Sequence, residues 1–369
     1  MNVIQFDVVI AGGGPSGCAA AIALKQSGIN VCLVDKEHEN KRKVGESIPG
    51  ASVRLLKKLG INGIDSLLNS SDYKHCLVNA SSWGNEEWVY KSGIQNPEGG
   101  GYHVNRAILD KALLQRAISV GVVVYADMID NVNPISNQTN LGFTIRFKYD
   151  GQKSINTKWL IDATGRKATI GRKFGLKRER IDDQMAAVNW VSTPENDTDH
   201  ATRIKSVPDG WWYTSLLPDQ SRVIGFQSLP NTVSKMYKQP DLFFEKFNNA
   251  GILSYEIKKE SRLQSIAVEA GLAKSNPVVK NHILCVGDAA LSFDPLSSQG
   301  IFFALYSGIK GAEAIINCLG NSNIEDKILC DYQSIVQRVF NENRKSLQYF
   351  YLNELRYQNN PYWKGRWLF

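Results

Sequence analysis

The sequence predicts an α/β protein with a Rossmann-like parallel sheet, an inserted antiparallel β-sheet and a helical C-terminal segment. Three observations support this fold class. The first 35 residues follow the order strand, turn, helix, strand of a βαβ unit. Strands with alternating apolar residues follow one another between about residues 185 and 268. An apolar strand returns at residues 282–286, and the chain is helical after about residue 302.

The N-terminal βαβ unit consists of short apolar runs separated by glycine. Residues 6–11 form the first run, residues 18–25 an Ala-rich helix that ends near Gly28, and residues 29–34 the second strand. This order predicts two parallel strands joined by a crossover helix.

A glycine motif, G-x-G-x-x-G, lies in the turn between the first strand and the helix. Its glycines allow the backbone to approach a pyrophosphate, and the helix N-terminus faces that anion. Asp35 ends the next strand, where a carboxylate can accept hydrogen bonds from ribose hydroxyls and would repel a 2′-phosphate. We therefore expect FAD or NAD to contact Gly12, Gly14, Pro15, Ser16, Gly17, Asp35 and Lys36.

The length of 369 residues suggests about two domains, and the order of the segments predicts that they interleave. A helix at residues 105–119 and strands at 122–125 and 159–163 continue the nucleotide-binding part, whereas residues 77–101 are irregular and aromatic. We expect a discontinuous FAD-binding domain of residues 1–76, 101–182 and 276–320, a substrate domain of residues 77–100 and 183–275, and a C-terminal helical segment of residues 321–369.

Composition excludes several classes of protein. The chain is 43% hydrophobic and 21% charged with a net charge of +7 that forms no basic tail, which argues against disorder and against a nucleic-acid partner. No apolar stretch approaches the roughly 20 residues of a membrane helix. The six cysteines form no CxxC pair and the five histidines have no ligand spacing, so we expect no metal and a cytoplasmic location.

Four further motifs identify a family. Residues 103–106, 162–166, 285–290 and 294–301 have the sequences HVNR, DATGR, CVGDAA and DPLSSQGI. With the glycine motif, and in this order, they resemble the FAD-dependent monooxygenase and halogenase superfamily, typified by aromatic hydroxylases. The resemblance implies a glutathione-reductase-type FAD-binding domain in the aromatic-hydroxylase arrangement, with FAD as the cofactor. It implies FAD contacts from Arg106, Thr164, Gly165, Gly287, Asp288, Pro295, Ser298, Gln299, Gly300 and Ile301.

The last of these motifs starts a helix beneath the flavin pyrimidine edge in the family. Free backbone N–H groups there stabilise the negative charge of a reduced flavin without a titrating side chain. The chain has no second glycine-rich nucleotide motif, so electrons are expected from an external donor, such as a flavin reductase or NAD(P)H, with O2 as the oxidant. We expect an aromatic, apolar substrate pocket between the two domains.

Hydroxylation and halogenation are the two main alternatives. The sequence GESIP at residues 45–49 and the nearby Lys74 resemble halogenases, where a lysine meets hypohalous acid. Residues 210–218 match the halogenase motif W-x-W-x-I-P only in part, and the halide loop Ser-Thr-Gly of that family is Ser298-Gln299-Gly300 here. These departures favour hydroxylation, with Lys74 relevant only to a halogenase.

The subgroup resemblance is to LodB/GoxB-type flavoproteins, which mature tryptophylquinone enzymes. It depends on GESIP, on the sequences SWG at 82–84, GWWY at 210–213 and LSSQGI at 296–301, and on the aromatic tail 349–366. It implies an FAD-dependent monooxygenase that hydroxylates a tryptophan in the precursor of an amino-acid oxidase during cysteine tryptophylquinone biogenesis. The pocket candidates are Glu46, Trp211 and Tyr213.

Other readings of these residues remain open. The protein could halogenate an indole or pyrrole, act as a non-catalytic FAD-bound maturation chaperone, or reduce an alkene. Glu46 could serve the pocket or cap the helix that follows it, and Trp211 and Tyr213 could be core residues. The tail could dock a partner or pack over the FAD-binding domain.

Overall fold

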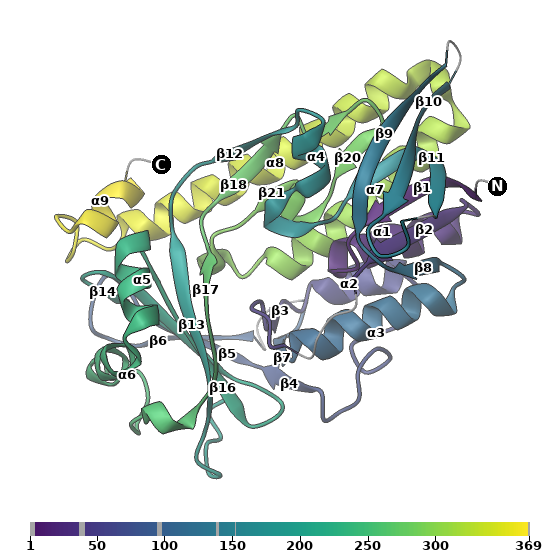
Figure 1. Cartoon of the computed structure of the whole chain (residues 1–369). Helices are drawn as coiled ribbons and strands as arrows, with labels where there is room; N and C mark the ends of the chain where they lie inside the picture. The colour runs from purple at the N-terminus through teal and green to yellow at the C-terminus, as the bar shows by residue number, and fades with distance from the viewer. Residues whose placement is uncertain (1–3, 37–40, 94–97, 138–139, 152, 368–369) are drawn as a thin grey trace.

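The computed structural model of the chain describes residues 4–36, 41–93, 98–137, 140–151 and 153–367. A mixed sheet with helices packed on it forms one half of the molecule, and a second sheet with two helices of its own forms the other (Figure 1). The predicted division into domains at residues 76, 100, 182, 275 and 320 stays a prediction.

The first sheet has eight strands, and five of them are parallel. Its main order is β19-β20-β11-β1-β2-β8, and the hairpin β9–β10 is added on β11. The strands are β1 (Ile4–Ala11), β2 (Val31–Asp35), β8 (Val123–Ala126), β9 (Ile129–Asn137), β10 (Asn140–Phe147), β11 (Ser154–Asp162), β19 (Val279–Lys280) and β20 (Ile283–Cys285).

The register of the parallel strands aligns their carboxyl ends. Ala11, the last residue of β1, pairs with Val34 on β2 and with Asp162 on β11. The glycine turn, Asp35 and the turn after Asp162 therefore meet at one edge of the sheet. Nucleotides bind at this edge in open α/β sheets.

Different elements cover the two faces of the first sheet. Helices α1 (Pro15–Gln26), α3 (Arg106–Ser119) and α7 (Gly300–Gly320) pack on the side of Val8 and Ile10. Val9 faces the other way, into a cluster with side chains of the hairpin β9–β10. Because β1 is buried on both faces, its sequence is a nearly continuous apolar run.

The second sheet has seven strands in the order β17-β13-β16-β15-β14-β5-β6. All neighbours are antiparallel except β14 and β5, which run parallel. The strands are β5 (Val78–Ser82), β6 (Val89–Ser92), β13 (Met185–Ser192), β14 (Thr202–Val207), β15 (Gly210–Leu216), β16 (Ser221–Ser228) and β17 (Arg262–Glu269).

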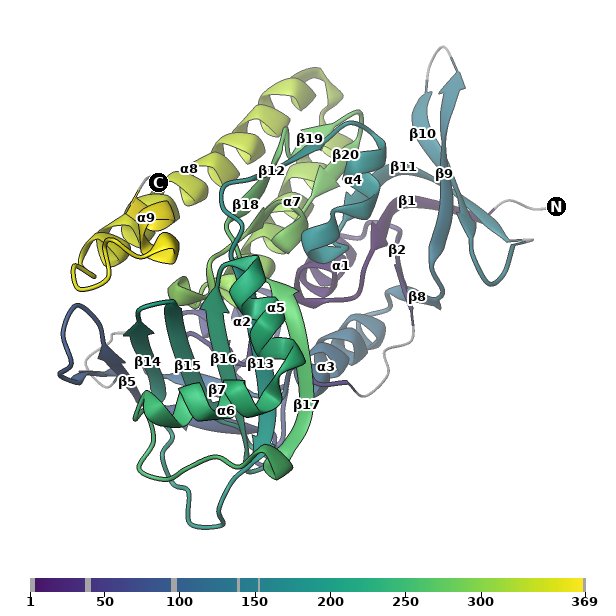
Figure 2. The same cartoon turned by 60° about the vertical axis from the view of Figure 1, so that its left-hand side comes forward.

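Successive side chains along each strand of the second sheet point to opposite faces of the sheet. Figure 2 shows helices α5 (Pro230–Lys238) and α6 (Pro240–Asn249) lying over one face, where Trp212 packs against Phe243 and Phe247. The neighbours of Trp212 in sequence, Trp211 and Tyr213, point to the opposite face. The predicted antiparallel sheet is present, and α5 and α6 are an addition to it that the sequence analysis did not anticipate.

Two small three-stranded sheets and two short helices are further elements of the described fold. The small sheets have the orders β3-β7-β4 and β12-β18-β21. Their elements are β3 (Ser47–Ile48), β4 (Tyr73–Cys76), β7 (Gly101–Val104), β12 (Lys177–Arg180), β18 (Ala273–Asn276) and β21 (Leu291–Ser292), and the helices are α2 (Ser52–Lys58) and α4 (Thr169–Lys173).

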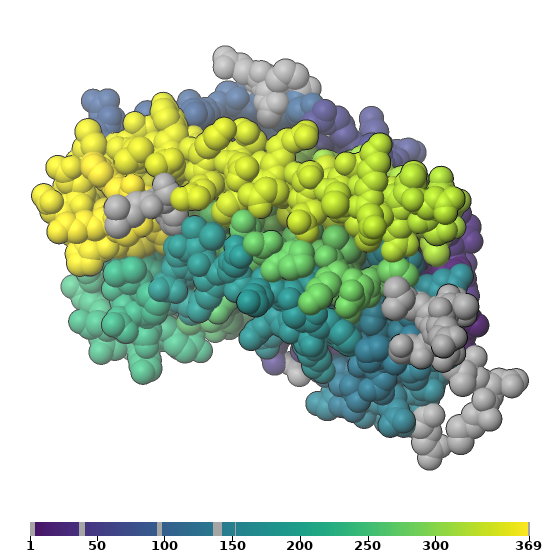
Figure 3. All heavy atoms as spheres, turned by 90° about the horizontal axis from the view of Figure 1, so that it is seen from above, coloured from purple at the N-terminus to yellow at the C-terminus, as the bar shows by residue number. Residues whose placement is uncertain are grey.

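The C-terminal segment consists of α8 (Glu325–Leu352) and α9 (Pro361–Trp367). Figure 3 shows α8 lying along one whole face of the molecule, with α9 at its end. Tyr351, Tyr362 and Trp363 are buried, and the Trp363 Nε1 donates a hydrogen bond to the Val207 carbonyl at 3.0 Å. These tail aromatics therefore pack against the second sheet, whereas Tyr349 is 66% exposed.

No described helix has both the length and the apolar character that crossing a membrane requires. Within the same part of the chain, no group of three or more His, Cys, Asp or Glu side chains is placed to hold a metal ion.

Candidate functional site

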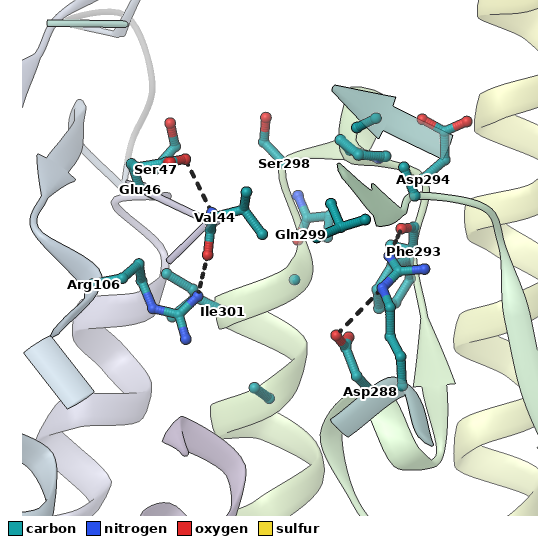
Figure 4. Close-up of a pocket in the computed structure, with 18 of the residues that line it drawn as sticks. Val44, Glu46, Ser47, Arg106, Asp288, Phe293, Asp294, Ser298, Gln299 and Ile301 are labelled. Atoms are coloured by element: carbon teal, nitrogen blue, oxygen red, sulfur yellow. Dashed lines mark hydrogen bonds and ion pairs between the residues drawn. The ribbon is translucent and has the colours of Figure 1, made fainter. Parts of the chain in front are cut away.

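A cavity of about 330 Å³ lies between the carboxyl edge of the first sheet and the face of the second sheet opposite α5 and α6. Figure 4 shows Glu46, Ser47 and Arg106 on one side and Asp288, Phe293 and Asp294 on the other, with Ser298, Gln299 and Ile301 between them. The sheet face adds mostly apolar side chains, among them Ala186, Val188, Ile204, Trp211, Tyr213 and Val268.

The glycine turn leaves open space in front of α1. Gly12 has a φ of 109°, and a Cβ there would collide with the Ala163 carbonyl oxygen, so the turn requires glycine. A Cβ on Gly14 would meet nothing within 4 Å. Helix α1 begins at Pro15 with no side-chain cap and no acidic residue in its first turn. Uncapped N–H groups facing open space fit a pyrophosphate, and Gly14, Pro15 and Ser16 line the cavity.

Asp35 lies against this turn. It is the last residue of β2, and a Cβ on Gly13 would be 2.5 Å from its Oδ2. The carboxylate therefore sits beside the turn that would hold the pyrophosphate, where a ribose can reach it. Lys36 follows at the surface and is exposed.

Arg106 connects α3 with the segment that carries Glu46. Its Nη1 donates a hydrogen bond to the Val44 carbonyl at 2.8 Å, and its Nη2 pairs with Asp110 at 3.1 Å. Lys43 contacts the same carboxylate at 2.9 Å. Arg106 lines the cavity, so it can meet a phosphate while it holds residues 43–46 in place.

The DATGR turn is held together by Asp162, which is fully buried. Its carboxylate accepts hydrogen bonds from the backbone N–H groups of Thr164, Ile170 and Gly171, and from the Thr164 hydroxyl at 2.6 Å. Gly165 lines the cavity, whereas Thr164 is not among the described lining residues. Thr164 therefore shapes the turn from behind.

Arg166, which the sequence analysis did not select, crosses the far side of the cavity. It donates hydrogen bonds of 2.7 Å to the carbonyl groups of Gly271 and Phe293, and its Nε lies 3.7 Å from Asp288. The side chain of Asp288 is 39% exposed and lines the cavity. Gly287 stands behind it, with its N–H bound to the Ser307 hydroxyl at 2.8 Å.

Helix α7 points its N-terminus into the cavity. Gln299 is its N-cap, no side chain caps it, and a Cβ on Gly300 would meet nothing within 4 Å. The lining residues here are Pro295, Ser298, Gln299, Gly300 and Ile301, all of which the sequence analysis selected. Uncapped N–H groups facing open space fit the electron-rich edge of a flavin.

Glu46 is the buried carboxyl group of the cavity. It is 4% exposed, its Oε2 accepts a hydrogen bond from the Gly45 N–H at 2.9 Å, and its Oε1 has no partner among the described residues. Burial raises the pKa of Glu46 to about 7. Helix α2 has no side-chain cap, so Glu46 does not cap it.

Trp211 and Tyr213 both line the cavity. The Trp211 Nε1 donates a hydrogen bond to the Tyr351 hydroxyl at 3.2 Å, so its indole is fixed from behind. Tyr213 lies on Gly225, where an added Cβ would collide with the ring. Burial, with the nearby Glu46 as a second cause, raises the pKa of Tyr213 well above its ordinary value.

Lys74 lies in the small sheet that also contains Ser47. It is on β4, in register with His103, and is half-buried. It is not among the described residues that line the cavity. The cavity thus brings Glu46, Trp211 and Tyr213 together with eleven of the predicted FAD residues. These are Gly14, Pro15, Ser16, Arg106, Gly165, Asp288, Pro295, Ser298, Gln299, Gly300 and Ile301. The predicted residues outside the described lining are Gly12, Gly17, Asp35, Lys36, Lys74, Thr164 and Gly287.

Gln227 is a lining residue that the sequence analysis missed. It pairs with Trp211 across β15 and β16 and faces the same side of the sheet. The alternation of side chains along the strand predicts that Gly225 and Gln227 face the same side of the sheet. It does not predict that this side is the one of Trp211, because that depends on the register between β16 and β15.

The comparisons with known proteins agree with this geometry. Residues 5–321 match the model of the FAD binding domain family. The chain belongs to this family. FAD is therefore the cofactor, as predicted, and the predicted fold class and the assignment as an FAD-dependent oxidoreductase of the monooxygenase and halogenase group are confirmed.

Three relatives illustrate the range of the group. LodB of Marinomonas mediterranea, provisionally named an FAD-dependent oxidoreductase, is 24% identical over 99% of this chain and 98% of its own. The flavin-dependent halogenase CmlS superimposes with a TM-score of 0.83 at 22% identity, covering 99% of this chain and 68% of CmlS. QhpG, a peptidyl tryptophan dihydroxylase essential for tryptophylquinone cofactor biogenesis, gives a TM-score of 0.79 at 20% identity, covering 98% and 78%.

Proposed function

We propose that this protein is an FAD-dependent monooxygenase that hydroxylates a tryptophan side chain in a partner precursor protein during tryptophylquinone cofactor biogenesis. The observation that carries the proposal is the cavity in which an uncapped α7 N-terminus meets an apolar sheet face with Trp211 and Tyr213. An indole fits such a surface. The likeness to LodB over nearly the whole length of both chains and the likeness to QhpG support the same function.

The chain's own residues would bind and orient the indole. Bound FAD, once reduced by an external donor, supplies the oxidising chemistry with O2. Trp211 and Tyr213 present ring surfaces, and the neighbouring apolar side chains exclude water. Glu46 can take up a proton at Oε1 as the indole is substituted, since a pKa of about 7 suits proton transfer at neutral pH.

Halogenation is the second candidate, because the halogenase CmlS superimposes with a higher TM-score than QhpG, 0.83 against 0.79. Two observations weigh against it. Lys74 is outside the described cavity lining, and Gln299 stands in the position where the resembling halogenases have threonine. We therefore place hydroxylation first.

Mass analysis of a co-expressed precursor oxidase tests the proposal. With the flavoprotein, a reductant and air, the tryptophan of the precursor should gain oxygen, and it should not when the reductant is withheld. Quinone formation that is unchanged without flavin reduction would instead identify a chaperone. A chlorine or bromine isotope pattern that appears with halide and disappears in Lys74→Ala would overturn hydroxylation in favour of halogenation.

A further inference from the structure

Gln227 is a buried polar side chain in the apolar part of the cavity. It is 1% exposed and lines the cavity, and neither Oε1 nor Nε2 has a hydrogen-bond partner among the described residues. An unpaired buried amide costs free energy, which a ligand group recovers when it pairs with the amide.

The described side chains around Gln227 form no hydrogen bond with its amide group. Its partner across the sheet is Trp211, whose only donor, Nε1, is bound to Tyr351. The other lining residues of the sheet face near it are mostly aliphatic, such as Val188 and Val268. The amide therefore presents one acceptor and one donor group to whatever enters the cavity.

The charged groups of the cavity indicate what that ligand lacks. The two described arginines that line it are both engaged, Arg106 with Val44 and Asp110, and Arg166 with two carbonyl groups and Asp288. The described acidic lining residues outnumber them: Glu46, Glu269, Asp288 and Asp294. Both arginines already hold protein acceptors and lie beside residues assigned to FAD, so the carboxylate of a free amino acid would find no uncommitted cation among the described lining residues.

We propose that Gln227 binds the neutral backbone of the substrate, namely the N–H and C=O of the tryptophan residue that is modified. In an extended residue these two groups point to the same side, so Oε1 of Gln227 can accept from the tryptophan N–H while Nε2 donates to the tryptophan C=O. Gln227 thereby selects peptide-bonded tryptophan over free tryptophan. This inference rests on the proposed function, since it takes the indole as the group that enters the cavity.

Ligand binding to the oxidised FAD-loaded protein tests the inference without any turnover. The probes are N-acetyl-tryptophan amide, free tryptophan and 3-methylindole, which has the ring but no amide. We expect the amide to bind at least tenfold more tightly than the other two. Gln227→Met keeps the length of the side chain and removes its polar atoms, so it should abolish this preference and leave the affinity for 3-methylindole within twofold.

Thr214→Val is the matched control. Thr214 is fully buried on the adjacent strand with an unpartnered hydroxyl, but it lies on the opposite face of the sheet. This variant should keep the preference for the amide. Equal loss of affinity for all probes in Gln227→Met, or no preference in the unaltered protein, would overturn the inference.

A second series keeps the inference testable if Gln227→Met does not fold. In the unaltered protein, N-acetyl-tryptophan methylamide should bind about tenfold more tightly than its Nα-methyl derivative, in which a methyl group replaces the hydrogen of the tryptophan N–H. Equal affinities would contradict the role of Gln227. These binding measurements need no reductant and no turnover. If tryptophan hydroxylation is not observed, the proposed function is refuted, but the measured preference of the cavity for the amide is unaffected.

Discussion

Glu46 makes the protein sensitive to pH because its carboxyl group is buried with one oxygen unpaired. Its pKa of about 7 in the folded protein exceeds the ordinary value of 4.5, so the folded state binds this proton more tightly than the unfolded chain. The stabilisation is complete below about pH 4.5 and is lost as the pH rises through about 7.

Glu46→Gln should remove this pH dependence. A shift of this size corresponds to about 3 kcal/mol in the free energy of unfolding, as an upper figure. Urea unfolding gives the free energy of unfolding at pH 5 and at pH 8. From pH 5 to pH 8 this free energy should decrease more in the unaltered protein than in Glu46→Gln. The exposed Glu87 provides the control, because Glu87→Gln should follow the unaltered protein. The same pH dependence in all three proteins would contradict the assignment of a raised pKa to Glu46.

Gly14→Ala should weaken FAD binding without destabilising the fold. A Cβ at this position meets nothing within 4 Å, so the fold tolerates alanine, but the methyl group occupies the space assigned to the pyrophosphate. We expect a melting temperature of the FAD-free protein within about 2 °C of the original and a Kd for FAD raised at least tenfold. Gly365→Ala is the control, since a Cβ there also meets nothing and lies in α9. Unchanged FAD affinity in Gly14→Ala would place the pyrophosphate elsewhere.

Helix α8 holds the loop before α7 through Tyr351. The Tyr351 hydroxyl donates a hydrogen bond to Asp294 Oδ2 at 2.7 Å and receives one from Trp211. Asp294 is fully buried, and its other oxygen accepts from the Leu296 N–H at 2.9 Å. The C-terminal segment therefore connects the sheet face with the loop that leads to the flavin end of α7.

Tyr351→Phe should weaken both the fold and the cofactor site. Asp294 loses a donor while it stays buried, which costs about 1–3 kcal/mol in the free energy of unfolding. Thermal unfolding should show a lower melting temperature, and an FAD fluorescence titration should show a higher Kd for FAD. Tyr349→Phe, at an exposed position two residues earlier in α8, should change neither. If the two variants behave alike, the Tyr351 hydroxyl does not support the loop.

The elements beside glycine motifs and the antiparallel sheet were predicted from the sequence, whereas helices α5 and α6 and the hairpin β9–β10 were not. The βαβ unit and the α7 N-terminus follow from apolar runs beside glycine motifs. The hairpin β9–β10 escaped prediction because its first strand contains Asn131, Asn133 and Pro134 between its apolar residues, and pairing with β11 stabilises it.

Some residues of the candidate site were predicted from the sequence, and others were found only in the structure. The motif residues around the FAD position were selected from the sequence because their spacing reflects the cofactor. Arg166 belongs to the DATGR motif but was not selected as a site residue, and Gln227 was missed. Their roles depend on contacts with distant segments, Gly271 and Phe293 for the first and β15 for the second. A single sequence carries no signal for such pairing.

At the scale of the whole molecule, the net charge of +7 bears on partner docking. If the partner precursor is acidic at its contact surface, the affinity of the complex should fall as salt screens the attraction. Raising NaCl from 50 to 500 mM should weaken binding at least tenfold, measured by surface plasmon resonance. Binding that does not respond to salt would leave the charge without a role in docking.

The position of Arg366 and Tyr351 against Asp294 has a consequence for biosynthesis. The glycine turn leaves the ribosome early, yet the loop leading to α7 gains these two contacts only after α8 and α9 have emerged. Nascent chains and products truncated before α8 would therefore lack a finished flavin site. We therefore expect a product that ends before α8 to retain FAD less well than one that includes α9.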